Sequence, residues 1–299
     1  MGFLDILLSG QLLFAALVTG ALYALVALGL NLVYGTMRVL NVAHGDLVML
    51  GAYAAFYAFS MAGWSPLLAA PLIAAIGGLA GYALYTSVFR RLLDVGALNA
   101  TRLEGNSLLL FFGISILVQN VAAAVFTPNN QGYQYLSEIH QLGTVSMTGN
   151  RIAALLIAGA ACAAIAVFLG RSVSGLALRA VIERREAAYV VGVNVDRVQA
   201  MSFVLGFGTA ALGGVLISML EQFSPFSGFP FTIAGFIVII LGGLGNIGAG
   251  LAAALLLGAI ETYGVALTSA NLRSVLLYGV FVGSLLVFPR GIFRRPGRT

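Results

Sequence analysis

Three polar residues and a glycine interrupt an otherwise apolar sequence near its start: Asn41, His44, Gly45 and Asp46, in the stretch NVAHGDLVML. His44 and Asp46 lie two positions apart, directly before an apolar run. Ionisable groups at membrane depth usually mark the route of a solute or an ion. We therefore predict that these four residues line a translocation path. The alternative is a helix N-terminus, where Asp46 satisfies free amides of the first turn and offsets the helix dipole.

Neither a metal site nor a catalytic site is predicted around His44. A metal ion would need further ligands, and the second histidine, His140, lies in a separate polar loop. No GxSxG motif is present, and no serine partner for the His44 and Asp46 pair is evident. We predict no catalytic residues and no cofactor held by this chain.

A glycine-rich stretch, ILGGLGNIGAG, contains a second set of candidate residues. Gly243, Gly245 and Gly248 form a GxGxxG pattern, and Glu261 lies 18 positions after Gly243, which imitates a dinucleotide-binding fingerprint. We reject that interpretation, because the following run is apolar on every face and no alternating strand and helix pattern surrounds it.

A break in a membrane helix explains this stretch better, because such a break exposes backbone amides and carbonyls to a solute path. The alternative is that the glycines serve only close helix packing. The path residues predicted here are Gly242, Gly243, Gly245 and Asn246.

Residues 171–199 form the one long polar and charged segment, with five arginines and three acidic residues between apolar runs. Within it, Ala180, Arg184 and Ala188 fall on one helical face, and Ala187 lies beside them. Small residues let a short helix lie flat on a partner, and Gly192 and Asn194 offer a stop. The segment is either a docking surface or a solvated amphipathic loop.

The elements that must position these residues are membrane helices. Of the 299 residues 60% are hydrophobic and 8% are charged, against about 25% charged residues in soluble domains. We predict an all-α fold, a polytopic transmembrane helical bundle forming one membrane domain over residues 1–299. The single Cys162 excludes an intramolecular disulfide. All 15 basic residues are arginine, so the lysine of a phosphate-binding P-loop is missing and another subunit would have to hydrolyse ATP.

About eight or nine membrane segments are predicted. Apolar runs cover residues 11–34, 47–62, 67–89, 106–126, 151–170, 200–220, 231–260 and 274–288. The glycine-rich middle of the run near 232–262 predicts either two short helices or a re-entrant hairpin. Glu221 and Glu261 fall at the outer ends of spans, where we expect carboxylates in contact with water.

The distribution of arginine sets the expected orientation. Segments 90–105 and 171–199 and the tail 289–299 carry most of the arginines, which predicts that they face the cytoplasm. Loops 127–150 and 221–230 contain no basic residue and are expected outside. The C-terminus is then cytoplasmic and the N-terminus outside. The net charge of +5 reflects this bias rather than a nucleic-acid partner.

Four motifs resemble one known family. Glu186, Ala187 and Ala188 followed by Gly192 match the E-A-A-x-x-x-G signature of bacterial ABC importer permeases. NVAHGDLVMLGAY at 41–53, ILGGLGNIGAG at 240–250 and LLVFPRGIF at 285–293 resemble the branched-chain amino-acid-type ABC transporter permeases over nearly the whole chain. One departure from the longer signature of other importers is that no Leu-Pro follows Gly192.

The resemblance implies a non-catalytic subunit of the bacterial plasma membrane. It implies a coupling helix that seats in a partner ATPase, formed by Arg184, Glu186, Ala187, Ala188, Gly192 and Asn194. It also implies the partners: a second permease subunit, homologous or identical, two cytoplasmic ATP-binding subunits and an extracytoplasmic solute-binding protein. Amino acids, above all branched-chain ones, are the expected solutes; urea, amides or other small organic solutes are the alternative. A secondary transporter or a channel that needs no ATP is the alternative from another class.

Overall fold

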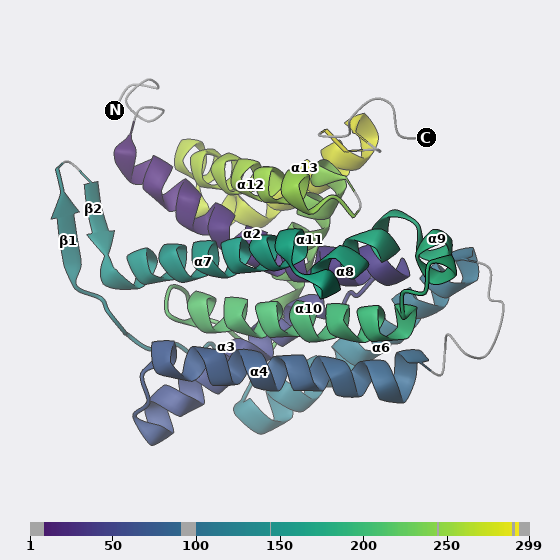
Figure 1. Cartoon of the computed structure of the whole chain (residues 1–299). Coiled ribbons are helices and arrows are strands. Elements are labelled where there is room, and N and C mark those ends of the chain that lie inside the picture. Colours follow the sequence, from purple (N-terminus) through teal and green to yellow (C-terminus); the bar gives the residue numbers. More distant parts are fainter. Residues whose placement is uncertain (1–8, 91–99, 144, 244, 289–290, 293–299) are drawn as a thin grey trace.

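The computed structural model describes residues 9–90, 100–143, 145–243, 245–288 and 291–292 (Figure 1). Within those ranges, eight helices are long and apolar enough to cross a membrane, which confirms the predicted helical bundle. The spans are α2 (Gly10–Met37), α3 (His44–Ala62), α4 (Pro66–Leu84) continued by the π-helical turn η1 (Tyr85–Phe89), α6 (Ala100–Phe126), α7 (Gly149–Arg171), α10 (Val195–Ser218), α12 (Ile247–Leu267) and α13 (Arg273–Val287) with its preceding 3-10 turn η2 (Ala270–Leu272).

Helices α2 and α10 form the centre of the bundle. α10 packs against α2, α3 and α4, and α2 packs against α12 as well (Figure 1). About two thirds of the residues in the most apolar stretches of α2 and α10 are buried, whereas fewer than a third are buried in those of α4, α6 and α13. The outer helices therefore present apolar side chains such as Leu68, Leu117 and Leu286 on the outside of the bundle, as expected for a surface that faces lipid.

The run near 232–262 is broken as predicted. The 15-residue α11 (Gly228–Gly242) ends at the glycine-rich stretch, and α12 begins at Ile247. The apolar run was expected to end at residue 260, which left 261–273 as a connection to the next run, and this was wrong. α12 continues to Leu267, because no proline or polar run interrupts its apolar sequence before Thr268.

The two ends of the bundle carry different structures (Figure 1). At one end, the polar segment before α7 contains an antiparallel hairpin, β1 (Ile139–Leu142) and β2 (Val145–Thr148), which the sequence did not predict. At the other end lie α8 (Val173–Glu183) and the short α9 (Arg185–Val190). We call these the hairpin end and the α9 end. Most of the basic tail and residues 91–99 lie outside the described residues.

Candidate functional site

Helix α3 begins inside the bundle rather than at its end. The Nε2 atom of His44, the first residue of α3, donates a hydrogen bond to the carbonyl oxygen of Val26 at 3.0 Å, and Val26 lies in the interior of α2. His44 and Asn41 are fully buried, and Asp46 is nearly so. The residues between Met37 and His44 therefore turn back along α2, which carries the predicted polar stretch into the bundle.

The first turns of α3 and α11 meet at Gly45. The Gly45 amide donates to Thr232 Oγ1 at 2.9 Å, and Thr232 Oγ1 donates to the Val42 carbonyl at 3.0 Å. A Cβ atom added at Gly45 would overlap the Gly228 carbonyl, and one added at Gly228 would lie 2.7 Å from Asp46 Oδ1. Two helix N-termini, whose partial positive charges favour anionic groups, are thus brought together by two glycines that no larger residue can replace without movement.

The capping alternative is met only in part: Asp46 lies in the first turn of α3, where it opposes the helix dipole, but no bond from a backbone amide of that turn to its side chain is found. Asp46 Oδ1 accepts from Gln119 Nε2 of α6 at 2.9 Å, and no side-chain cap bond is made at this N-terminus. Within the described part of the chain, several buried polar atoms have no hydrogen-bond partner: Asp46 Oδ2, His44 Nδ1, both side-chain polar atoms of Asn41 and the Tyr53 hydroxyl. Leaving buried polar atoms unpaired is costly, so these atoms set the stretch apart from the apolar interior around it.

The second predicted path stretch lies on another face of α2. Gly242 is the last residue of α11, and Gly243 and Gly245 have φ values of 87° and 82°. The Gly245 amide donates to Asn31 Oδ1 of α2 at 3.0 Å, and Asn246 Oδ1 accepts from the Ala249 amide at 3.2 Å to cap α12.

Asn31 follows Val26 by five positions, which is about 7.5 Å along the helix and about 140° around it. The structure therefore places the His44 stretch and the glycine turn at neighbouring levels of α2 but on different faces. Their predicted role in translocation stays a prediction. Among the described residues there is no group of three or more His, Cys, Asp or Glu side chains that could hold a metal ion.

The predicted coupling segment is two helices, not one. Arg184 is extended, with φ −152° and ψ 99°, and it ends α8 and begins α9. The expectation that Ala180, Arg184 and Ala188 share one helical face was wrong, because the helical repeat does not continue through an extended residue. The surfaces of α8, α9 and the end of α2 border an open cavity of about 430 Å³ lined by residues 35–38 and 181–187.

Gly192 and Asn194 have separate roles at the end of this segment. Gly192, at φ 85°, takes the left-handed conformation that ends α9, and the Val193 amide donates to the Ala188 carbonyl at 3.0 Å. Asn194 instead begins α10, because its Oδ1 accepts from the Arg197 amide at 3.0 Å. Ala188 is buried, whereas Arg184, Glu186, Ala187 and the apolar Tyr189 and Val190 are exposed.

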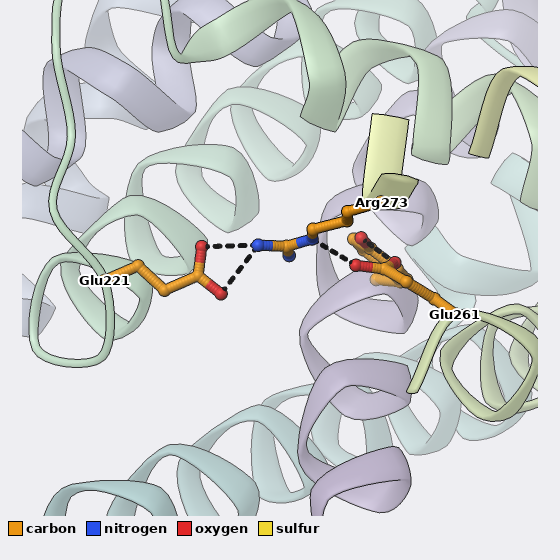
Figure 2. A network of polar contacts seen from close by, with 4 residues as sticks. Glu221, Glu261 and Arg273 are labelled. Carbon is orange, nitrogen blue, oxygen red and sulfur yellow. Dashed lines mark hydrogen bonds and ion pairs between the residues drawn. The ribbon is translucent and has the colours of Figure 1, made fainter. Parts of the chain in front are cut away.

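An ion network at the hairpin end was not predicted (Figure 2). Arg273 Nη1 donates to the two carboxylate oxygens of Glu221 at 3.0 and 3.1 Å, and Arg273 Nε donates to Glu261. The Tyr23 hydroxyl of α2 donates to the other oxygen of Glu261. The Glu261 side chain is only 6% exposed, so the expectation that it lies in water was wrong.

The amino-acid sequence of the chain matches one family of known proteins. A sequence profile described as "Branched-chain amino acid transport system / permease component" matches residues 12–285. The chain belongs to this family. The matched range contains all eight spanning helices apart from their outermost residues, together with α8 and α9, so the permease is a membrane-embedded transport component.

Individual relatives agree with the family. The permease is 31% identical to the high-affinity branched-chain amino acid transport system permease protein LivH of Salmonella typhimurium, over 96% of both chains. It is 30% identical to LivH of Escherichia coli K12 and 29% identical to the corresponding BraD protein of Pseudomonas aeruginosa, again over 96% of both chains. No solved structure matches the permease significantly.

The sequence contained an indication of the ion network around Arg273. Glu261 is an ionisable residue inside a long apolar run, and such a residue is expected to face the bundle with a partner. Arg273 is the nearest basic residue, 12 positions on. Because Glu261 was assigned to the end of a span, its helical position was missed and Arg273 was not considered as its partner.

Proposed function

We propose that the permease is one transmembrane subunit of an ATP-driven ABC importer in a bacterial plasma membrane, with branched-chain amino acids as its solutes. The family and the printed names of the relatives support the transport role and the class of solute. In the proposed complex it pairs with a second permease subunit. Two cytoplasmic ATP-binding subunits supply the energy, and a solute-binding protein outside the cell delivers the amino acid.

The observation that carries this proposal is the exposed surface of α9. Tyr189, Val190 and Val191 are 74%, 83% and 77% exposed, beside the charged residues Arg185 and Glu186. An apolar patch with a charged rim marks a protein interaction site. The six-residue helix α9 packs against the bundle through the buried Ala188. A movement of an ATP-binding subunit bound to α9 would therefore be passed to the bundle.

Contacts from α9 extend to the helices that hold the polar cluster. α9 packs on α8 and on α10, and α10 packs against α2, α3 and α4. On α8, Ile182 lies against Gly35 of α2 and Gly245 of the α11–α12 turn. In the proposed cycle, closure of the ATP-binding subunits moves α9 and α8, shifts α10 and α2, and changes access to the polar cluster at His44, Gly45 and Asp46.

Glu186→Arg tests the coupling role in cells that express the complete importer. Uptake of labelled L-leucine is expected to fall to background, while the amount of permease in the membrane is unchanged. Arg179→Glu on α8 is the matched control, because Arg179 is also exposed at the α9 end but lies outside α9. Unchanged uptake and unchanged co-purification of the ATP-binding subunits with Glu186→Arg would contradict the coupling role. Uptake of urea in place of leucine would contradict the class of solute.

A further inference from the structure

A cavity of about 180 Å³ opens beside Arg273 at the hairpin end. It lies between the loop that follows α10, the first turns of α11 and α13, and α2. Its polar wall is formed by Arg273 and Glu221, and its apolar wall includes Ile217, Phe231, Leu277 and Tyr278. The volume is well below the roughly 300–1,000 Å³ of pockets for drug-sized ligands, so it suits a small solute.

The polar wall offers one cation and one anion side by side. The side chains of Arg273 and Glu221 are 39% and 47% exposed, so both reach the cavity and water. A second cavity of about 90 Å³ is also bordered by Arg273, Glu221, Phe231 and Ile217, so the ion pair lies between two open spaces. A zwitterion needs this arrangement, because its carboxylate requires a donor such as guanidinium and its ammonium requires a carboxylate.

Arg273 stays oriented when Glu221 exchanges partners. Its Nε atom is held from behind by Glu261, whose side chain is almost completely buried and which also accepts from Tyr23 (Figure 2). If Glu221 turns toward a ligand ammonium, the ligand carboxylate takes its place on the Nη side of Arg273. No charge is left unpaired by this exchange, so binding avoids the penalty of an isolated buried ion.

The apolar wall sets the preference for the side chain of the ligand. Ile217 and Leu277 are buried at 4% and 5% exposure and stand on different helices, α10 and α13. The aliphatic side chain of a ligand placed between them is removed from water, which favours binding. Glycine has no such side chain and gains nothing there. The solute exchanges one partly exposed ion pair for two others, so the net electrostatic gain is small. The affinity should therefore be weak, with a Kd on the order of 1 mM, as a site of transit requires.

We infer that the cavity bounded by Arg273, Glu221, Phe231 and Leu277 is a binding site for a zwitterionic α-amino acid with an aliphatic side chain. This inference rests on the proposed function, since it places a step of amino-acid transport at the hairpin end. It concerns residues other than the predicted path around His44, and it can fail while the transport role stands.

Binding of L-leucine to the full-length permease in lipid nanodiscs tests the inference by saturation-transfer NMR, with no partner subunit present. L-Leucine should give a saturable signal. 4-Methylpentanoate, which lacks the ammonium, 3-methylbutylamine, which lacks the carboxylate, and glycine should each bind roughly tenfold more weakly or not at all. Equal signals for leucine and 3-methylbutylamine would mean that only the apolar wall binds, and the inference would be overturned.

Variants separate a binding site from a network that only supports the fold. Ser274 lines the cavity and is exposed, so Ser274→Phe fills the cavity without entering the ion network. This variant and Glu221→Gln should each abolish the leucine signal. Ser269→Phe, at an exposed position in the connection that precedes α13 and outside the cavity lining, should bind as the unmodified permease does. Full binding by Ser274→Phe would exclude the cavity.

Uptake by the complete importer distinguishes the two proposals. If the complete importer takes up leucine and the isolated permease shows no saturable signal, the binding site is wrong and the proposed function stands. If leucine binds with the expected dependence on Ser274 but the complete importer takes up none, the site stands and the proposed function is wrong.

Discussion

At the scale of single residues, Arg273 shows how burial decides the energetic weight of a charge. Its two carboxylate partners differ greatly in side-chain exposure, at 6% for Glu261 and 47% for Glu221. Exposed ion pairs contribute little because water screens them and the side chains lose freedom. Removing one partner of a buried pair is costly because it leaves the other charge uncompensated. Glu261 should therefore matter for the fold, and Glu221 should be free to exchange partners.

Glu261→Gln should lower the free energy of unfolding by about 3 kcal/mol, and Glu221→Gln by about 1 kcal/mol or less. The glutamine at 261 can still accept from Tyr23, so the difference reports the lost charge. Thermal unfolding of the two purified variants in detergent, followed by intrinsic fluorescence, measures the order. Equal shifts for the two variants would contradict the distinction between the buried and the exposed partner.

Gly45→Val should destabilise the permease strongly, because the added atoms overlap the Gly228 carbonyl and displace the Thr232 hydroxyl. Overpacking of this kind costs about 1–3 kcal/mol, occasionally more. Gly113→Val in α6 is the matched control, because a Cβ at Gly113 meets nothing within 4 Å. Size-exclusion profiles of fluorescently tagged variants provide the measurement. A monodisperse, fully stable Gly45→Val protein would show that α3 and α11 do not meet as closely as described.

At the scale of elements, the structure divides the charged segment into parts that the sequence did not separate. The amphipathic residues of 171–199 were recognised, and Gly192 was correctly expected to stop a helix. The extended conformation of Arg184 was not foreseen, since nothing in the residue types around it disfavours a helix. Asn194 was read as part of the stop, but its side chain caps the next helix. A helix break that depends on tertiary packing cannot be recognised from the local sequence. A helix stop at a glycine in the left-handed region can be, because glycine adopts that conformation readily.

Gly192→Ala should destabilise the end of α9 by about 1–2 kcal/mol, because an alanine at φ 85° suffers contact between Cβ and the following carbonyl. Gly170→Ala, inside α7 with open space around it, should instead be neutral or stabilising by up to about 1 kcal/mol. Thermal unfolding gives the signs. If the α9 turn positions the docking surface, Gly192→Ala should also reduce co-purification of the ATP-binding subunits, and Gly170→Ala should not.

At the scale of the whole molecule, hydropathy was sufficient to predict the bundle and the number of long spans, and the glycine content predicted the break after α11. Membrane helices can be recognised from the sequence because each must satisfy its own backbone hydrogen bonds over about 20 apolar residues. Hydropathy could not predict that α3 starts inside the bundle at His44, because the return of residues 38–43 along α2 depends on packing. It also could not pair Glu261 with Tyr23, which lies 238 positions away.

The distribution of arginine over the two ends predicts the orientation of the permease. Among the described residues, Arg38, Arg90, Arg171 and the arginines of 179–197 lie at or near the α9 end, whereas Arg151 and Arg273 lie toward the hairpin end. Arg273 is paired with two glutamates. Because basic residues are retained in the cytoplasm, the α9 end should be cytoplasmic and the hairpin end outside.

Labelling of single cysteines tests this orientation, starting from Cys162→Ala, which removes the native thiol. Ile139→Cys on the hairpin, at a position 67% exposed, should react with a membrane-impermeant maleimide in intact cells. Tyr189→Cys on α9 should react only after the plasma membrane is opened. Leu117→Cys, exposed on the apolar face of α6, should stay unlabelled in both conditions because lipid covers it. Labelling of Tyr189→Cys in intact cells would place α9 outside, where no ATP-binding subunit could reach it, and the coupling mechanism would fail with the orientation.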